Sequence, residues 1–130
     1  MLVDTSGFFC LYDGADLDHS RALELYASSR RRVTTSYVLS EYVALAEIRG
    51  VPRPEIVRFS SRVLSENDLE IVWVNEGLHS KAVELLARRL DKSYSLCDAV
   101  SFILMRERGI ADAITTDKHF EQEGFIRLLR

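Results

Sequence analysis

Four acidic residues of this chain stand where a carboxylate is costly, and they indicate where chemistry takes place. Asp4 ends an apolar N-terminal run, and Asp117 directly follows the predicted strand Ala113–Thr116. Glu41 and Asp98 lie on the apolar faces of predicted helices. An ionised carboxylate in apolar surroundings costs free energy unless it is paired or bound to a cation. Hard divalent cations such as Mg²⁺ or Mn²⁺ take oxygen ligands, so the pattern indicates a metal site.

Each acid also has an ordinary structural explanation. Asp4 and Asp117 could cap the short helices or turns that follow them. Asp98 completes a Ser-x-x-Asp capping-box pattern with Ser95, and Glu41 could pair with an arginine. Four separate structural roles would have to arise independently, whereas one shared metal site explains all four positions. If the acids share one site, their charges should raise at least one carboxyl pKa when no metal is bound.

The histidines and cysteines do not form a second metal-binding pattern. His19, His79 and His119 are far apart in the sequence, so no zinc motif is indicated. His119 is expected to be a helix residue that faces solvent. Cys10 and Cys97 stand in apolar surroundings without a CxxC pair, and we expect two buried thiols and no disulfide.

The apolar periodicity predicts alternating strands and helices that would bring the four acids together. Short runs rich in Val, Ile and Thr indicate strands, and apolar residues three and four apart indicate helices. We expect strands at 2–3, 33–35, 69–74, 113–116 and 125–129, and helices over 18–29, 36–49, 55–65, 78–90 and 95–108. This alternation predicts an α/β fold, a three-layer α/β/α sandwich with a mostly parallel central sheet. Ligands of such sheets bind at the carboxyl ends of the strands, where all four acids can meet.

Length and composition predict a single globular domain over residues 1–130. The formal net charge is −3, so the strongly basic balance of many nucleic-acid binders is absent. Lys81, Lys92 and Lys118 are the only lysines among 17 basic residues, which leaves 14 arginines, the better bidentate phosphate ligands. No uncharged apolar run approaches the roughly 20 residues of a membrane helix, and Asp4 interrupts any signal-peptide pattern. We therefore expect a cytoplasmic protein without membrane association.

Four segments of the chain resemble, in order, the PIN-domain ribonucleases, and in particular the VapC toxins of toxin–antitoxin pairs. The segments are MLVDTSGFF, TTSYVLSEYVAL, SLCDAVSFILMRERGI and ADAITTDKHFEQEGF, and each contains one of the four acids. No segment is specific alone, but together they span essentially the whole chain. The resemblance implies a PIN-like nuclease fold and these site residues: the metal-site acids Asp4, Glu41, Asp98 and Asp117, with Ser6 and Thr116 as polar supports.

The same resemblance implies the activity, which is hydrolysis of RNA phosphodiester bonds with Mg²⁺ or Mn²⁺. The cation would activate water and stabilise charge on the phosphate, and the products would carry 5′-phosphate and 3′-hydroxyl ends. Asp4 and Asp98 are the expected direct ligands, whereas Glu41 and Asp117 could act through water. Asp112 also lies near the fourth segment, but it precedes the predicted strand, so Asp117 is preferred.

The resemblance further implies partners. It indicates the toxin of a VapBC-type pair, with RNA as substrate, a cognate antitoxin protein as inhibitor, and a homodimer. The apolar helices around Tyr37–Leu45 and Ile56–Leu64 are candidate grooves for the antitoxin. Several basic residues are expected to contact RNA phosphates around the acids: Arg30–Arg32, Arg49, Arg53, Arg58 and Arg62.

Three other functions have to be considered. A non-catalytic PIN-like module would use the same fold to bind a protein partner. A phosphoacceptor receiver domain would need an acidic pair after the first strand, but Asp4 is followed by Thr5 and Ser6. A haloacid-dehalogenase-type phosphatase would need Asp-x-Asp, and Ser6 occupies the third place of that motif.

Overall fold

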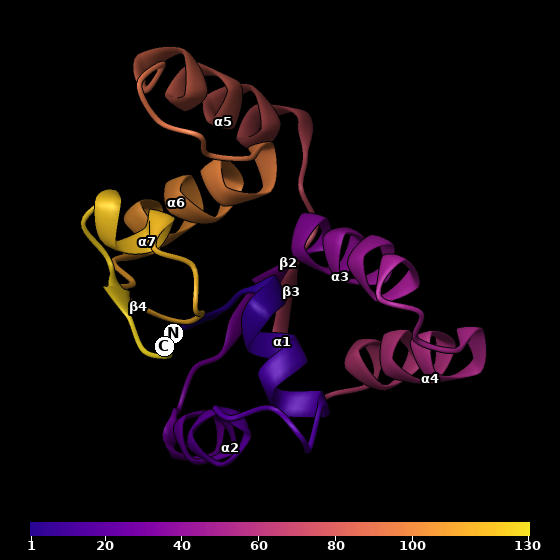
Figure 1. The fold of residues 1–130 in the computed structure, drawn as a ribbon. Coiled ribbons are helices and arrows are strands. Elements are labelled where there is room, and N and C mark those ends of the chain that lie inside the picture. Colours follow the sequence, from indigo (N-terminus) through magenta and orange to yellow (C-terminus); the bar gives the residue numbers. More distant parts are fainter.

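The computed structural model describes residues 1–130 and shows a five-stranded sheet with helices on both faces (Figure 1). The strands are β1 (Leu2–Val3), β2 (Val33–Thr35), β3 (Glu70–Val72), β4 (Asp112–Ile114) and β5 (Ile126–Arg127). The helices are α1 (Thr5–Tyr12), α2 (His19–Ser28), α3 (Ser36–Ile48), α4 (Arg53–Leu64), α5 (Glu76–Arg88), α6 (Leu96–Arg108) and α7 (His119–Gln122). The strand order is β3-β2-β1-β4-β5, and every neighbouring pair is parallel. The predicted α/β/α sandwich is confirmed.

The alternation of side chains along the strands divides the core into two layers. Leu2 packs with residues of α5, α6 and α7, whereas Val3 packs with residues of α1, α3 and α4. Figure 1 shows these two groups of helices on opposite sides of the strands. Ala113 and Ile114 of the neighbouring strand divide in the same way. Successive strand residues point to opposite faces, so two short strands suffice to anchor helices on both sides. The loops at the carboxyl edge are thereby held from both layers.

Helix α1 lies directly against β4, because Gly7 places no side chain between them. A Cβ atom at Gly7 would lie 2.1 Å from the carbonyl oxygen of Ile114. The N–H of Asp4 donates to the same carbonyl at 3.2 Å. The start of α1 is therefore fixed at the carboxyl end of β4, which is where the first and last predicted acids can meet.

Strand β4 begins and ends earlier than predicted, and this changes the surroundings of the last acid. Asp112 is its first residue and Ile114 its last, so Asp117 follows the strand only after two threonines. The prediction was wrong because β-branched threonines favour strands by propensity. In the structure their polar groups contact α1 instead, and the N–H of Thr116 donates to Ser6 Oγ at 2.9 Å.

The structure adds the short helices α1 and α7 to the predicted elements, and the remaining differences lie at element ends and leave the topology unchanged. Strand β3 ends two residues early, because the N–H of Val74 donates to Ser36 Oγ at 2.9 Å. Helix α5 begins two residues early at Glu76, and Asn75 caps it through its side-chain oxygen. Strand β5 contains only two of its five expected residues. Among the helices, none combines the length and the apolar character needed to cross a bilayer.

Candidate active site

Asp4 is a buried carboxylate at the junction of β1 and α1. It occupies the N-cap position of α1, but its side chain accepts no capping hydrogen bond. Thr115 Oγ1 donates to Asp4 Oδ2 at 2.9 Å, whereas Oδ1 is buried without a hydrogen-bond partner. Burial, with the added charges of Asp98 and Glu41, raises the pKa of Asp4 to about 7. A buried oxygen without a partner is costly, and a bound cation would satisfy it.

Asp98 stands in the first turn of α6 and has both of its protein partners on one oxygen. Its Oδ2 accepts the N–H of Ser95 at 3.0 Å and lies 3.0 Å from His119 Nδ1. Ser95 Oγ accepts the N–H of Asp98 in return, so the capping box indicated by the sequence is present. Burial raises the pKa of Asp98 against these hydrogen bonds, and the charge of Asp117 raises it further. Capping therefore occupies Oδ2 and leaves Oδ1 for another ligand.

Asp117 lies in the loop before α7, close to Asp98. Its Oδ1 accepts the backbone N–H of His119 at 2.9 Å, and its own N–H donates to Thr115 Oγ1 at 3.0 Å. This contact spans two residues and forms an Asx turn, whereas the N-cap of α7 is Lys118. Ligand atoms of Asp98, Asp117 and His119 all lie within 4.8 Å of one another. This spacing is compatible with a shared oxygen-liganded cation.

Glu41 approaches the other acids from α3, which packs against α6. Its side chain is half-buried and pairs with no arginine, so the alternative of an arginine partner is wrong. Its charge raises the pKa of Asp4 and of the buried Cys97 thiol, which places the carboxylate near both groups. Each acid therefore has another acid as an electrostatic neighbour. The carboxyl pKa values of Asp4 and Asp98 are raised, as predicted, but burial contributes more to both shifts than the charges of the neighbouring acids do.

Two hydroxyl groups connect the first acid to the last. Ser6 Oγ lies 3.1 Å from Thr115 Oγ1 and accepts the N–H of Thr116. Because the single proton of Thr115 Oγ1 points to Asp4, Ser6 must donate to Thr115. The family resemblance implied Thr116 as a support, but this residue contributes only its backbone N–H and carbonyl. The sequence could not favour Thr115 over Thr116, because the role of Thr115 depends on its contacts with Ser6 and Asp4, although the Thr-Thr-Asp117 sequence marked both threonines.

His119 is a second contact of the acids that the sequence did not indicate. Its Nδ1 lies 3.0 Å from Asp98 Oδ2 and 3.4 Å from Asp117 Oδ1, and its Nε2 lies 3.2 Å from Ser93 Oγ. The expectation that His119 faces solvent is wrong, since its side chain is only 25% exposed. The reason is tertiary: the single-turn helix α7 packs against α6 and brings the imidazole to the start of that helix.

The basic residues are arranged differently from the prediction. Arg30–Arg32 precede β2, so in a parallel sheet they lie at the amino edge, opposite the acids. Their predicted place beside the acids is therefore wrong. Arg127 ends β5 and does reach the site loop, where its Nη1 donates to the Thr116 carbonyl at 3.0 Å. The other predicted phosphate contacts lie at the end of α3 and on α4: Arg49, Arg53, Arg58 and Arg62.

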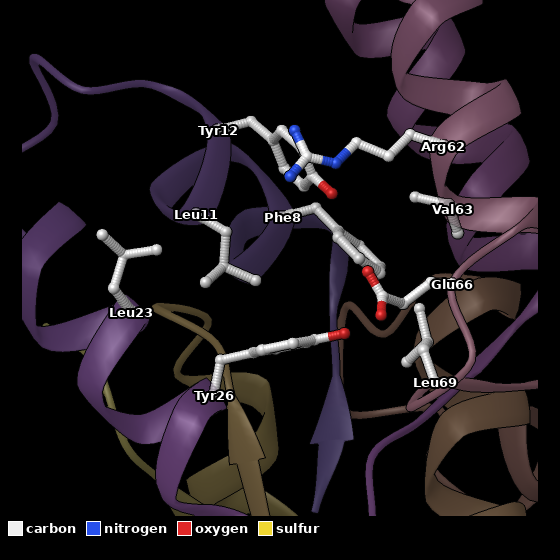
Figure 2. A pocket seen from close by; sticks show the side chains of 9 residues that line it. All are labelled: Phe8, Leu11, Tyr12, Leu23, Tyr26, Arg62, Val63, Glu66 and Leu69. Carbon is white, nitrogen blue, oxygen red and sulfur yellow. The ribbon is translucent and has the colours of Figure 1, made fainter.

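A cavity of about 370 Å³ lies apart from the acids, and none of the four acids lines it. Figure 2 shows side chains of α1, α2 and α4 pointing into it, with Tyr26 lying across its floor and Arg62 above Tyr12. Seven of its nine lining residues are hydrophobic. The lining residues are Phe8, Leu11, Tyr12, Leu23, Tyr26, Arg62, Val63, Glu66 and Leu69.

The fold and the acids agree with a known family. The model of the family described as PIN domain matches residues 1–125, so this chain belongs to the PIN domain family. The predicted resemblance is thereby confirmed at the level of the family. Membership of this family sets aside the receiver-domain and phosphatase alternatives.

Individual relatives narrow the comparison. The 23S rRNA-specific endonuclease VapC20 of Mycobacterium tuberculosis, found in two strains, is 33% identical over 129 residues. These residues cover 98% of this chain and 97% of the relative. The crystal structure of M. tuberculosis VapC20, a sarcin–ricin loop cleaving toxin, superposes with a TM-score of 0.88 at 29% identity. That match covers 99% of this chain and 98% of the other, so the resemblance to VapC toxins is also confirmed.

Proposed function

We propose that this chain is a divalent-metal-dependent endoribonuclease, the toxin of a VapBC-type toxin–antitoxin pair. The observation that carries the proposal is the buried Asp4, whose Oδ1 has no partner although Asp98 and Glu41 are its charged neighbours. A structural carboxylate would be expected to have a cation or donors on both oxygens. The full-length similarity to an endonuclease supports the same conclusion.

Asp4 and Asp98 would hold Mg²⁺ or Mn²⁺ directly, each through the oxygen that the protein leaves without a hydrogen bond. Glu41 and Asp117 would complete the site through water or orient the attacking water molecule. When bound, the cation supplies Lewis-acid chemistry for attack of water on phosphorus. The donor set contains carboxylate oxygens, which suits these hard cations.

The surrounding residues keep the acids in place for this chemistry. Thr115 fixes Asp4 through one hydrogen bond and is itself held by Ser6. Burial keeps water away from Asp4, which strengthens its interaction with any cation. Exposed Lys118 and the partly buried Arg127 flank the site loop and would offset the repulsion between an acidic site and an RNA phosphate.

The proposed substrate is a structured rRNA loop, on the basis of the relative's printed activity, and the products would carry 5′-phosphate and 3′-hydroxyl ends. A synthetic hairpin with the sarcin–ricin sequence tests this, against a scrambled hairpin of equal length. We expect cleavage with Mg²⁺ or Mn²⁺ and none with a chelator. Equal cleavage of both hairpins would overturn the substrate assignment but leave the nuclease assignment standing.

The same assay tests the acids. We expect Asp4→Asn and Asp98→Asn to reduce cleavage at least about a thousandfold, since each removes a charged ligand of the cation. Asp91→Asn is the matched control, because its side chain is 74% exposed and its ion pair is with Lys92, away from the four acids. A chain that folds and binds protein partners but cleaves no RNA with any divalent cation would instead be the non-catalytic PIN-like module.

The antitoxin is proposed to occupy the cavity between α1, α2 and α4, which includes part of the predicted Ile56–Leu64 groove. Leu23 lines this cavity and is 46% exposed, whereas Leu90 is exposed elsewhere. Leu23→Glu should weaken binding of the co-expressed cognate antitoxin, and Leu90→Glu should not.

We further propose a homodimer and a cytoplasmic location. Size-exclusion chromatography with light scattering tests the dimer, and cell fractionation tests the location.

A further inference from the structure

His119 has both ring nitrogens engaged, which defines what it can do at the acidic site. Nδ1 lies 3.0 Å from Asp98 Oδ2, and Nε2 lies 3.2 Å from Ser93 Oγ. An ionised carboxylate only accepts hydrogen bonds, so Nδ1 must carry the proton in this contact. The hydroxyl of Ser93 can then donate to Nε2. A neutral imidazole with the proton on Nδ1 therefore satisfies both neighbours at once.

The contacts of His119 leave one oxygen of each neighbouring acid without a protein partner. Asp98 Oδ2 accepts from Ser95 N–H and His119 Nδ1–H, and no protein donor reaches Oδ1. Asp117 Oδ1 accepts the backbone N–H of His119 at 2.9 Å, which any residue at this position would supply, and it also lies 3.4 Å from Nδ1. One residue thus fixes one oxygen in each of two carboxylates. Their other oxygens are the atoms that the proposed cation would use.

The position of the ring is itself fixed from outside the site. The imidazole and the Tyr94 ring pack edge to face, with ring centroids 5.3 Å apart. At the other end of α7, Glu123 forms ion pairs with Arg89 at 3.0 Å and Arg106 at 2.6 Å. Since Arg106 belongs to α6, the helix that carries Asp98, these ion pairs lock α7 against that helix.

From these contacts we infer that His119 is a positioning residue, which orients Asp98 and Asp117 toward a divalent cation and is not itself a ligand. The inference rests on the proposed function, because it concerns the same cation. Residues that orient metal ligands from behind typically change metal affinity ten- to a hundredfold when they are removed. Loss of the imidazole should therefore weaken the site without removing any of the four acids.

Substitutions at His119 separate positioning from ligation, because an asparagine amide nitrogen can take the place of Nδ1 and a glutamine amide nitrogen the place of Nε2. Mn²⁺ affinity would be measured without RNA, from the electron paramagnetic resonance signal of free Mn²⁺, and Mg²⁺ affinity by competition. We expect His119→Ala and His119→Gln to weaken both cations about tenfold, and His119→Asn to restore most of the loss. Ser93→Ala, which frees Nε2 only, should cost no more than about twofold.

Two results would overturn the inference. Wild-type affinity in His119→Ala would show that the ring only packs against Tyr94. A loss that is much larger for Mn²⁺ than for Mg²⁺, and that asparagine does not restore, would show direct ligation by nitrogen. A wild-type chain that binds neither cation would instead overturn the proposed function.

The ring tautomer provides a separate readout that does not depend on metal. Long-range ¹H–¹⁵N correlation spectra of the metal-free protein should show the proton of His119 on Nδ1. A neutral ring with its proton on Nε2 alone would contradict the Asp98 contact and the inference with it. Melting temperatures of all variants, measured in the same buffer, distinguish altered affinity from unfolding.

Discussion

Two buried carboxylates of this protein are treated in opposite ways by their surroundings. Glu123 has ion pairs on both oxygens, with Arg89 at 3.0 Å and Arg106 at 2.6 Å. Burial alone would raise the pKa of Glu123, but the hydrogen bonds from the two arginines outweigh it, and the pKa is lowered. Asp4 has one neutral hydroxyl donor, and its pKa is raised to about 7. The structural acid is neutralised by the protein, and the candidate functional acid is left for a ligand.

The partners of a buried acid distinguish a structural role, as at Glu123, from a candidate functional role, as at Asp4. A buried charge is tolerated when it is paired, as at Glu123. At Asp4 the neighbours are other acids, so the fold itself contains an electrostatic cost. Such costs gather at functional sites, where a ligand removes them. If this contrast is real, neutralising Asp4 should raise the free energy of unfolding and neutralising Glu123 should lower it.

The largest expected effect is a gain of stability in metal-free Asp4→Asn. The folded pKa of Asp4, about 7, exceeds the ordinary value of 3.8, so the folded state binds more protons between these values. Wild-type stability should therefore fall as pH rises from about 4 to 7. Above pH 7 the variant should be more stable by up to about 4 kcal/mol. Urea unfolding of both proteins across this pH range measures the fall in wild-type stability and the gain in the variant. If the free energies of unfolding of the two proteins changed equally with pH, the contrast between Asp4 and Glu123 would be wrong.

Glu123→Gln should change stability in the other direction. Removing one partner of a buried ion pair costs about 3 kcal/mol, at the lower end of the usual range because both arginines reach solvent. Because the folded pKa is lowered, this stabilisation is fully present above the ordinary value of 4.5 and is lost below 4.5, as the pH falls through the lowered folded pKa. The same urea experiments test it. A variant as stable as wild type at pH 7 would show that the ion pairs contribute nothing.

Gly7→Ala tests whether backbone packing, and not ion pairing, places Asp4. The added Cβ would lie 2.1 Å from the Ile114 carbonyl oxygen, so α1 must move away from β4. We expect a loss of about 2 kcal/mol, together with weaker metal binding because Asp4 moves with the helix. Gly14→Ala is the matched control, since a Cβ there meets nothing within 4 Å. Equal behaviour of the two variants would contradict the prediction.

Thr115→Val should have the smallest effect on stability and still affect the site. It removes the only side-chain donor of Asp4 and the acceptor of the Asp117 N–H, which we expect to cost about 1 kcal/mol. Affinity for Mn²⁺ should fall, and Thr115→Ser should recover it. Thr116→Val is the control, because that side chain forms no hydrogen bond in the structure. If Thr116→Val proved the more damaging, the original sequence-based choice of support would be correct.

The fold could be predicted from the spacing of apolar residues, because short strands and amphipathic helices each produce a local pattern in the sequence. The carboxyl-edge placement of Asp4 follows from the apolar pair before it. The capping role of Asp98 could be predicted, since Ser95 stands three residues before it and caps are local. The end of β4 could not be predicted, because Thr115 has the propensity of a strand residue and bonds to α1 instead.

The sequence by itself determined the parallel α/β architecture, because burial patterns depend on neighbours along the chain. It also indicated four acids as a candidate site, and their shared role stays a prediction. Tertiary structure alone decided which groups surround those acids. His119 meets Asp98 across 21 positions, and Thr115 meets Asp4 across 111. Arg30–Arg32 lie at the amino edge of the sheet, opposite the acids, because they precede β2 and all strands are parallel. Contacts of this kind are set by packing between distant segments, which no local pattern records.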